Sequence, residues 1–242
     1  MSKLHHRHPE WQDSLKTSKP SKIECPLCAA IGKLYNKSNR KHYYSCPNCR
    51  GIYVGPGDLP SAEEEKEHYK KHNNDVDDPN YQAFVTPIVD AVKRDYGPED
   101  IGLDYGCGTG PVITKLLRDA GYQVKLYDPF FANYEQNLER QYDYIICCEV
   151  AEHFHDPAEE FWRLRLLLKP GGSLYVKTVL YCNDMDFDGW YYKDDPTHVF
   201  FYSETTLEWI RRHCGFSELS INEAQSKFED SIQLTHFQYI NQ

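Results

Sequence analysis

The chain has 242 residues, 40% of them hydrophobic, and a formal net charge of -10. This length allows one large α/β domain of about 150 residues beside a small module. No apolar run reaches the roughly 18 residues that a membrane span needs, and the basic, His-rich residues 1–20, which we expect to be flexible, lack the apolar core of a secretory signal. The odd count of nine cysteines favours free thiols, so we expect a soluble, cytoplasmic protein without a membrane span.

Two Cys-x-x-Cys pairs lie near the N-terminal end, Cys25 with Cys28 and Cys46 with Cys49, and seventeen residues separate them. This spacing is typical of a site in which four thiolates hold one zinc ion. Four thiolates leave no open coordination position, so the site is expected to be structural. We therefore predict a zinc ribbon over residues 21–56, with a rubredoxin-like iron site or redox-active pairs as the alternatives.

The loop between the cysteine pairs is basic and aromatic, and residues 1–50 as a whole carry ten Lys and Arg against three Asp and Glu. Residues 51–242 carry seventeen Lys and Arg against thirty-four Asp and Glu. Basic side chains interleaved with aromatic ones are typical of surfaces that bind single-stranded RNA, so RNA contact stays open beside a role in folding alone. The loop residues concerned are Lys33, Tyr35, Lys37, Arg40, Lys41, His42, Tyr43 and Tyr44.

Two helices are predicted between the ribbon and the main domain. Ser61 and Glu64 form a capping box that starts a highly charged helix running to about His72. We read residues 57–78 as a helical linker whose helix is a solvated bridge. A second helix, from about residue 81 to 96, has an apolar face that can cover a sheet, and it opens the main domain at residues 79–242.

The most specific motif is a glycine-rich loop between a strand at residues 101–105 and a helix at residues 111–119, followed by a strand at residues 123–127. Asp104 precedes the loop, and Asp128 ends the next strand, where it can accept hydrogen bonds from a ribose diol. A carboxylate before the loop would repel a pyrophosphate but suits a sulfonium, which favours S-adenosylmethionine over NAD. The candidate cofactor-binding residues are Asp104, Tyr105, Gly106, Cys107, Gly108, Gly110, Asp128 and Glu149.

The next strand, residues 143–148, ends at a segment with two carboxylates and a histidine. Because the carboxyl ends of parallel strands line the ligand crevice, Glu149, Glu152 and His153 should face the cofactor. Asp156 caps a helix to about residue 168, residues 169–172 form a turn, and a strand follows at residues 173–178. This alternation predicts a doubly wound, mostly parallel, Rossmann-like α/β sheet, with the zinc ribbon as a separate small module.

The remaining segment, residues 181–202, is rich in aromatic and acidic residues, as expected of a lid or substrate loop. Its aromatic rings can stack on a planar acceptor, although we expect Phe200 and Phe201 to belong to the core. Ser203 caps a helix that ends at Gly215, and residues 216–221 and 232–240 are predicted to form a closing pair of strands.

Taken together, the motifs at residues 103–110, 127–128, 149–153 and 168–172 resemble class I S-adenosylmethionine-dependent methyltransferases, over roughly residues 80–242. The Glu-x-x-Glu-His segment looks like that of ubiquinone-pathway O-methyltransferases and of small-RNA 2′-O-methyltransferases. In those families these side chains, with a later histidine, are associated with a divalent metal near the methyl acceptor. By position, the resemblance implies metal-ligand and catalytic roles for Glu149, Glu152, His153 and His198.

The spacing of Glu149, Glu152 and His153 would place them along one side of a helical turn, and such a donor set suits Mg²⁺, Mn²⁺ or Zn²⁺. The alternative is that these residues cap and pack without a metal. In either case His198 or His153 is the expected acceptor of the hydroxyl proton, directly or through the metal.

Three functions follow from these observations. The first is O-methylation of a small hydroxylated molecule. The second is RNA methylation guided by the ribbon, against which the acidic main domain argues. The third is a non-catalytic adaptor that only binds the cofactor. The sequence leaves the acceptor and the oligomeric state open.

Overall fold

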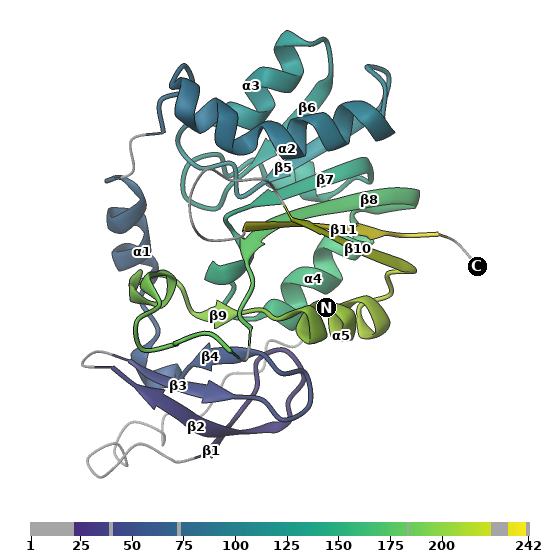
Figure 1. Ribbon diagram of the computed structural model, residues 1–242. Helices are drawn as coiled ribbons and strands as arrows, with labels where there is room; N and C mark the ends of the chain where they lie inside the picture. Colours follow the sequence, from purple (N-terminus) through teal and green to yellow (C-terminus); the bar gives the residue numbers. More distant parts are fainter. Residues whose placement is uncertain (1–21, 39–40, 72–73, 183, 224–231, 241–242) are drawn as a thin grey trace, which may run out of the picture.

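The computed structural model describes residues 22–38, 41–71, 74–182, 184–223 and 232–240. The predicted flexible tail, residues 1–20, lies outside the described residues, as do Arg40 and His72. The chain forms two sheets, with helices on both faces of the larger one (Figure 1). No described helix combines the length and apolar character that crossing a membrane requires.

The larger sheet has six strands in the order β10-β11-β8-β7-β5-β6. The strands β6, β5, β7 and β8 are parallel neighbours, and β11 and β10 add two antiparallel strands at one edge. This arrangement confirms the predicted α/β class with a mostly parallel sheet. The strand bounds are β5 Ile101–Tyr105, β6 Gln123–Tyr127, β7 Tyr142–Cys148, β8 Leu168–Val179, β10 Glu218–Glu223 and β11 Ile232–Gln238.

Helices α2 (Pro79–Asp95) and α3 (Val112–Asp119) cover one face of this sheet, and α4 (Pro157–Leu166) and α5 (Glu204–His213) cover the other (Figure 1). The helix ends follow the predicted signals. The Asp156 side chain accepts a hydrogen bond from the Glu159 N–H at 3.0 Å to cap α4, and Ser203 forms a capping box with Thr206 at α5.

The turn predicted at residues 169–172 lies within β8, which begins at Leu168, but the pairing with β7 passes from Leu168 directly to Ser173. Gly171 has φ +86° within this strand, and the pairing of β7 with β8 shifts register between Tyr142 and Tyr144. A glycine in the left-handed region lets the strand accommodate this irregularity without ending.

The smaller sheet has the order β1-β2-β3-β4-β9, and the cysteine pairs lie in the turns that follow β1 and β3. Its first four strands are β1 Lys22–Glu24, β2 Ile31–Lys37, β3 His42–Ser45 and β4 Ile52–Val54. The fifth, β9 (Phe200–Phe201), comes from the far end of the chain and pairs antiparallel with β4 (Figure 1). The ribbon is therefore joined by a shared sheet to the domain that carries the larger one.

Both residues of β9 are buried, Phe200 at 0% and Phe201 at 1% exposure, which confirms their predicted place in the core. Phe200 belongs to a hydrophobic cluster that includes ribbon residues such as Tyr44 and Tyr53 and also Phe161 of α4. One continuous core thus extends from the ribbon to the face of the larger sheet that α4 and α5 cover.

Helix α1 (Ala62–Tyr69) begins with the predicted capping box of Ser61 and Glu64. It is not a solvated bridge, because Glu65 is only 8% exposed and accepts a hydrogen bond from His155, Nε2 to Oε1, at 3.1 Å. The short 3-10 helices are η2 Pro56–Asp58, η3 Glu135–Leu138, η4 Ala151–His153 and η5 Tyr191–Asp194.

Candidate active site

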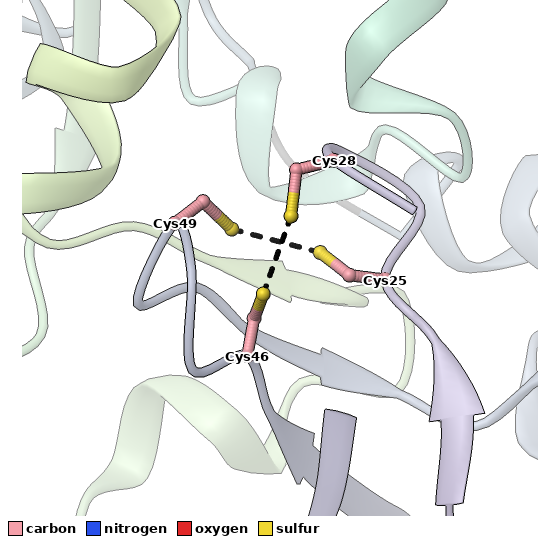
Figure 2. Close-up of side chains that lie close together, drawn as sticks. All are labelled: Cys25, Cys28, Cys46 and Cys49. Carbon is pink, nitrogen blue, oxygen red and sulfur yellow. Dashed lines mark hydrogen bonds between the residues drawn. The ribbon is translucent and has the colours of Figure 1, made fainter. Parts of the chain in front are cut away.

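The four predicted zinc ligands converge at one end of the ribbon (Figure 2). Their sulfur atoms lie within 4.8 Å of one another, with 3.6 Å between Cys25 and Cys49 and 3.3 Å between Cys28 and Cys46. Each pair comes from a tight turn, after β1 and after β3. Four sulfurs in this arrangement fit a tetrahedral zinc ion, which would hold the two turns together.

A cavity of about 1380 Å³ lies at the carboxyl ends of β5, β6 and β7. It is lined by the glycine loop, by the segment after β7, by helix α1 and by the segment around η5. Ligand cavities commonly enclose about 300–1,000 Å³, so this one has room for a cofactor and an acceptor together.

The glycine loop follows β5 as predicted. Gly106 and Gly108 have φ of +79° and +62°, so both occupy the left-handed region that favours glycine. At Gly110 a Cβ atom would lie 1.9 Å from the Asn74 carbonyl oxygen, so the close approach of residue 74 requires a glycine there. Gly106, Cys107 and Gly108 line the cavity.

Asp128 at the end of β6 fixes this loop. Its Oδ2 accepts a hydrogen bond from the Gly108 N–H at 2.9 Å, and its Oδ1 accepts from the N–H groups of Phe130 and Phe131 at 2.8 and 3.0 Å. The carboxylate therefore has a structural task that the sequence motif did not reveal. Oδ2 keeps a second lone pair for a hydroxyl donor.

Asp104 and Tyr105, adjacent in β5, point to different surroundings. The Asp104 carboxylate is buried behind the loop, is absent from the cavity lining and accepts a hydrogen bond from the Thr114 hydroxyl at 2.6 Å. Burial raises the pKa of Asp104 to about 6. Tyr105 does line the cavity, with its ring against Tyr127 and its hydroxyl donating to Glu160.

The segment after β7 does not place its three polar residues along one helical turn, as the spacing predicted. Glu149 has φ +52°, in the left-handed region, so it precedes the turn, and only Glu152 and His153 belong to η4. Glu149 lines the cavity but lies outside the group of converging metal-ligand atoms. Burial, and next the nearby charge of Glu152, raise the pKa of Glu149.

The two histidines each use one ring nitrogen to bind a backbone carbonyl. Nδ1 of His153 lies 3.0 Å from the Thr197 oxygen, and Nδ1 of His198 lies 2.6 Å from the Tyr192 oxygen. A carbonyl can only accept, so Nδ1 donates a hydrogen bond in both rings, which leaves Nε2 as the nitrogen that can bind a metal. Burial lowers the pKa of His198 to about 4, so its ring is neutral near pH 7.

Glu152 completes a group of three with these histidines. It is 0% exposed; its Oε2 accepts a hydrogen bond from the Thr178 hydroxyl at 3.0 Å, whereas its buried Oε1 has no partner among the described residues. One ligand atom each from Glu152, His153 and His198 lies within 4.8 Å of the others. A buried carboxylate oxygen without a partner is costly, and a cation at this position would satisfy it.

Comparison with known proteins decides the family. The family described as a methyltransferase domain matches residues 78–221, more than half of the chain. The chain belongs to the methyltransferase domain family. Ubiquinone biosynthesis O-methyltransferases of Yersinia pestis and Yersinia pseudotuberculosis are 29% identical to it over 92 residues, which span 38% of this chain and 38% of each relative.

Solved structures share the fold at low identity. The 1,6-didemethyltoxoflavin-N1-methyltransferase of Burkholderia thailandensis, solved with S-adenosylhomocysteine, has a TM-score of 0.54 and 13% identity, over 86% of this chain and 99% of its own. Human N-acetylserotonin methyltransferase, solved with S-adenosylmethionine, has a TM-score of 0.51 and 14% identity, and the match covers 75% of this chain and 57% of that protein's chain. The [4+2]-cyclase SpnF has a TM-score of 0.53 and 13% identity, and the match covers 76% of this chain and 98% of that protein's chain. Because this structure is a cyclase, the fold alone does not fix the reaction.

Helix α1 supplies side chains to the methyltransferase cavity that sequence reasoning missed. Glu65, His68 and Tyr69 all line it, the Tyr69 ring contacts His153 edge-on with centroids 5.3 Å apart, and His68 lies 3.2 Å from an Asp195 carboxylate oxygen. The high charge of the segment hid these contacts, because a charged helix is usually solvated.

The basic and aromatic loop of the ribbon has some side chains buried within the protein and others at its surface. Tyr43, Tyr44 and Lys41 are buried, at 1%, 2% and 8% exposure. The Tyr35 hydroxyl lies 2.8 Å from that of Tyr181, and His42 lies 2.9 Å from an Asp58 oxygen. These side chains make contacts within the protein, whereas Lys33 and Lys37 are exposed.

Proposed function

We propose that this protein transfers a methyl group from S-adenosylmethionine to an oxygen of a small hydroxylated acceptor, assisted by a divalent metal that Glu152, His153 and His198 hold. The observation that carries the proposal is the convergence of the Glu152 carboxylate and two imidazoles on the cavity that the glycine loop also lines. Cofactor and metal thereby meet in one space.

The donor set fits such an ion. Two imidazole nitrogens and one carboxylate, with positions left open for an acceptor, suit Zn²⁺ or Mn²⁺ better than Mg²⁺, which prefers oxygen ligands. Backbone carbonyls fix the orientation of His153 and His198, as is usual behind metal ligands. A bound divalent ion supplies Lewis acidity, which lowers the pKa of a nearby hydroxyl group.

The residues have distinct tasks in this reaction. The loop at Gly106 and Gly108 lets the backbone approach the cofactor, and Asp128 holds the loop and accepts from the ribose. The acceptor hydroxyl loses its proton to water, its oxygen forms a bond to the methyl carbon as the carbon–sulfur bond breaks, and S-adenosylhomocysteine leaves. Positioning of the two reactants supplies most of the rate. A pKa of about 4 makes His198 a weak proton acceptor near pH 7, which favours a ligand role over a base role.

The relatives and the surface chemistry favour a small acceptor. The curated relatives are named for O-methylation in ubiquinone biosynthesis, and Tyr69, Phe130 and Tyr191 place aromatic rings on the cavity wall, where a planar acceptor can stack. RNA is the less supported acceptor, because Lys41, Tyr43 and Tyr44 are buried and residues 51–242 carry an excess of acidic side chains.

The test uses S-adenosylmethionine with a labelled methyl group, together with separate low-molecular-mass and RNA fractions of a cell extract. We expect label in the small-molecule fraction, dependent on added Mn²⁺ or Zn²⁺. Glu152→Gln should lower turnover by about 10²-fold or more, while calorimetry shows unchanged S-adenosylhomocysteine affinity. The control is Glu67→Gln on the exposed face of α1. Label in RNA with a strong salt dependence, or in neither fraction, would overturn the small-acceptor proposal.

A further inference from the structure

The loop that carries His198 lies between the ribbon and the η4 turn. On the η4 side, the Val199 N–H donates to the Glu152 carbonyl at 2.8 Å, and the carbonyls of Tyr192 and Thr197 bind the two imidazoles. Both imidazole orientations therefore depend on where this loop, residues 192–199, is held.

The ribbon holds the other side of the same loop. Lys41, just before β3, donates from Nζ to the carbonyl oxygens of Asp195 and His198, both at 2.9 Å. The Tyr43 hydroxyl donates to the Lys193 carbonyl at 3.0 Å, and the Val54 N–H donates to the Val199 carbonyl at 2.9 Å. Three ribbon residues thus donate hydrogen bonds to four backbone carbonyls of residues 192–199.

Lys41 is unusual among these contacts because a lysine is seldom buried. Its side chain is 8% exposed in total, and moving an ammonium group out of water is costly unless hydrogen bonds and nearby negative charge compensate it. Two carbonyl oxygens accept from it, and Asp194 and Asp195 supply the charge. Both hydrogen-bond acceptors of the Lys41 ammonium group belong to the His198 loop. Contacts with this loop therefore explain why Lys41 is buried.

The metal cluster of the ribbon is connected to these contacts through its strands. Lys41 directly precedes β3, Tyr43 lies within it, and Cys46 directly follows it. Cys49 lies three residues before β4, which pairs with β9. Figure 1 shows β9 entering the ribbon sheet beside β4. Small four-cysteine modules depend on their metal to fold, so these strands need the zinc to keep their places.

We propose that the ribbon is a structural part of the catalytic centre and that Lys41 is a positioning residue, which holds the His198 loop so that Nε2 of His198 faces Glu152 and His153. The inference rests on the proposed function for the role of these three ligands. It differs from a ribbon that recruits RNA or another protein, because Lys41, a basic side chain that such a ribbon would present at the surface, is buried against the His198 loop.

The experiment compares Lys41→Met, which removes the donor and keeps most of the stem, with Lys33→Met at an exposed ribbon position. Both are studied as the full chain with zinc in the ribbon. In Lys41→Met we expect Co²⁺ affinity at the Glu152 site to fall roughly 10- to 100-fold and turnover to fall by about 10²-fold. Zinc content and S-adenosylhomocysteine affinity should stay as in the parent protein.

A second readout is independent of activity. Nitrogen NMR of labelled histidine reports which ring nitrogen is protonated, and the His198 signal is assigned with His198→Gln. We expect a single Nδ1-protonated form in the parent protein and in Lys33→Met, and a mixture of tautomers in Lys41→Met. An unchanged His198 signal together with unchanged Co²⁺ affinity in Lys41→Met would overturn the proposal.

The two proposals fail in distinguishable ways. A parent protein that binds no Co²⁺ at Glu152 and transfers no methyl group contradicts the proposed function, while the His198 signal still decides whether Lys41 positions the ring. If Lys41→Met does not fold, Tyr43→Phe removes one hydrogen bond to the same loop without a change of volume. A shifted His198 signal in that variant supports the inference, and an unchanged one contradicts it.

Discussion

Gly51 offers a test of how tightly the ribbon and the methyltransferase domain are packed. A Cβ atom at this position would lie 2.4 Å from Cζ and 2.8 Å from Cε1 of Phe200. The Phe200 ring has little freedom to move away, since it is fully buried and packs against Tyr53, at 6.3 Å between centroids, and Tyr202, at 4.8 Å. Gly51→Ala should therefore push β9 out of its place.

The expected size follows from overpacking, which costs about 1–3 kcal/mol. Alanine also reduces the conformational entropy of the unfolded chain, and this effect offsets about 0.4–1 kcal/mol of the overpacking cost. Because two ring atoms are overlapped, we expect a net loss of about 1–2 kcal/mol in the free energy of unfolding. For a chain of this size, that loss lowers Tm by roughly 2–8 °C.

Thermal unfolding of four variants checks the reasoning: Gly51→Ala, Phe200→Leu, the double variant that combines them, and a control. The control is Gly189→Ala, whose added Cβ would meet the flexible Asp186 carboxylate at 2.8 Å. In the double variant Gly51→Ala with Phe200→Leu, the shorter leucine side chain should relieve the overlap. The double variant should therefore lose less free energy of unfolding than the two single variants together, by about 0.5 kcal/mol or more. Parent-like unfolding of Gly51→Ala, or additive losses, would refute this account of the interface.

Three further predictions concern the cofactor and the zinc. Asp128→Ala should weaken S-adenosylhomocysteine binding roughly 10- to 100-fold in calorimetry, since it removes charged hydrogen bonds and loosens the loop; unchanged affinity would contradict the ribose assignment. Burial raises the pKa of Asp104 to about 6, so the stability that its protonated form contributes is lost as pH rises through 6. The affinity for the cationic cofactor should increase over the same pH range, by at most about tenfold per pH unit. An equal pH dependence of both quantities in Asp104→Asn would count against this role of Asp104. Removal by a chelator of the zinc expected at the cysteine cluster should speed amide exchange in β9, measured by mass spectrometry, and unaltered protection there would show that β9 is held without that metal.

Most of the fold could be predicted because its signals are local. The glycine loop, the strand before it and Asp128 after the next strand define one βαβ unit, and capping residues such as Ser61 and Ser203 mark helix starts. The strand predicted to start at residue 173 instead begins at Leu168, although Gly171 is left-handed and residues 169–172 have no partner in β7. The early start depends on the pairing of Leu168 with Tyr142 of the neighbouring strand, a contact that left no local signal in the sequence.

The site was less predictable because its geometry depends on contacts between distant residues. Glu152, His153 and His198 could be named from the motif, yet the spacing argument also placed Glu149 with them, and its left-handed backbone was not foreseeable from residue type. The role of α1 and the burial of Lys41 left no local signal. Lys41 and His198 are 157 residues apart in the chain, beyond the reach of any periodicity.

The two metal ions that we propose would be coupled energetically through β9. A zinc ion at the cysteine cluster would contribute free energy to folding of the ribbon, and the ribbon contacts the His198 loop through Lys41 and β9. A coupling of this kind is reciprocal, so an ion held by Glu152, His153 and His198 would also stabilise zinc in the ribbon by the same free energy. The cysteines would then influence methyl transfer while lying outside the catalytic cavity, and the ribbon would need no substrate of its own to be required for the reaction.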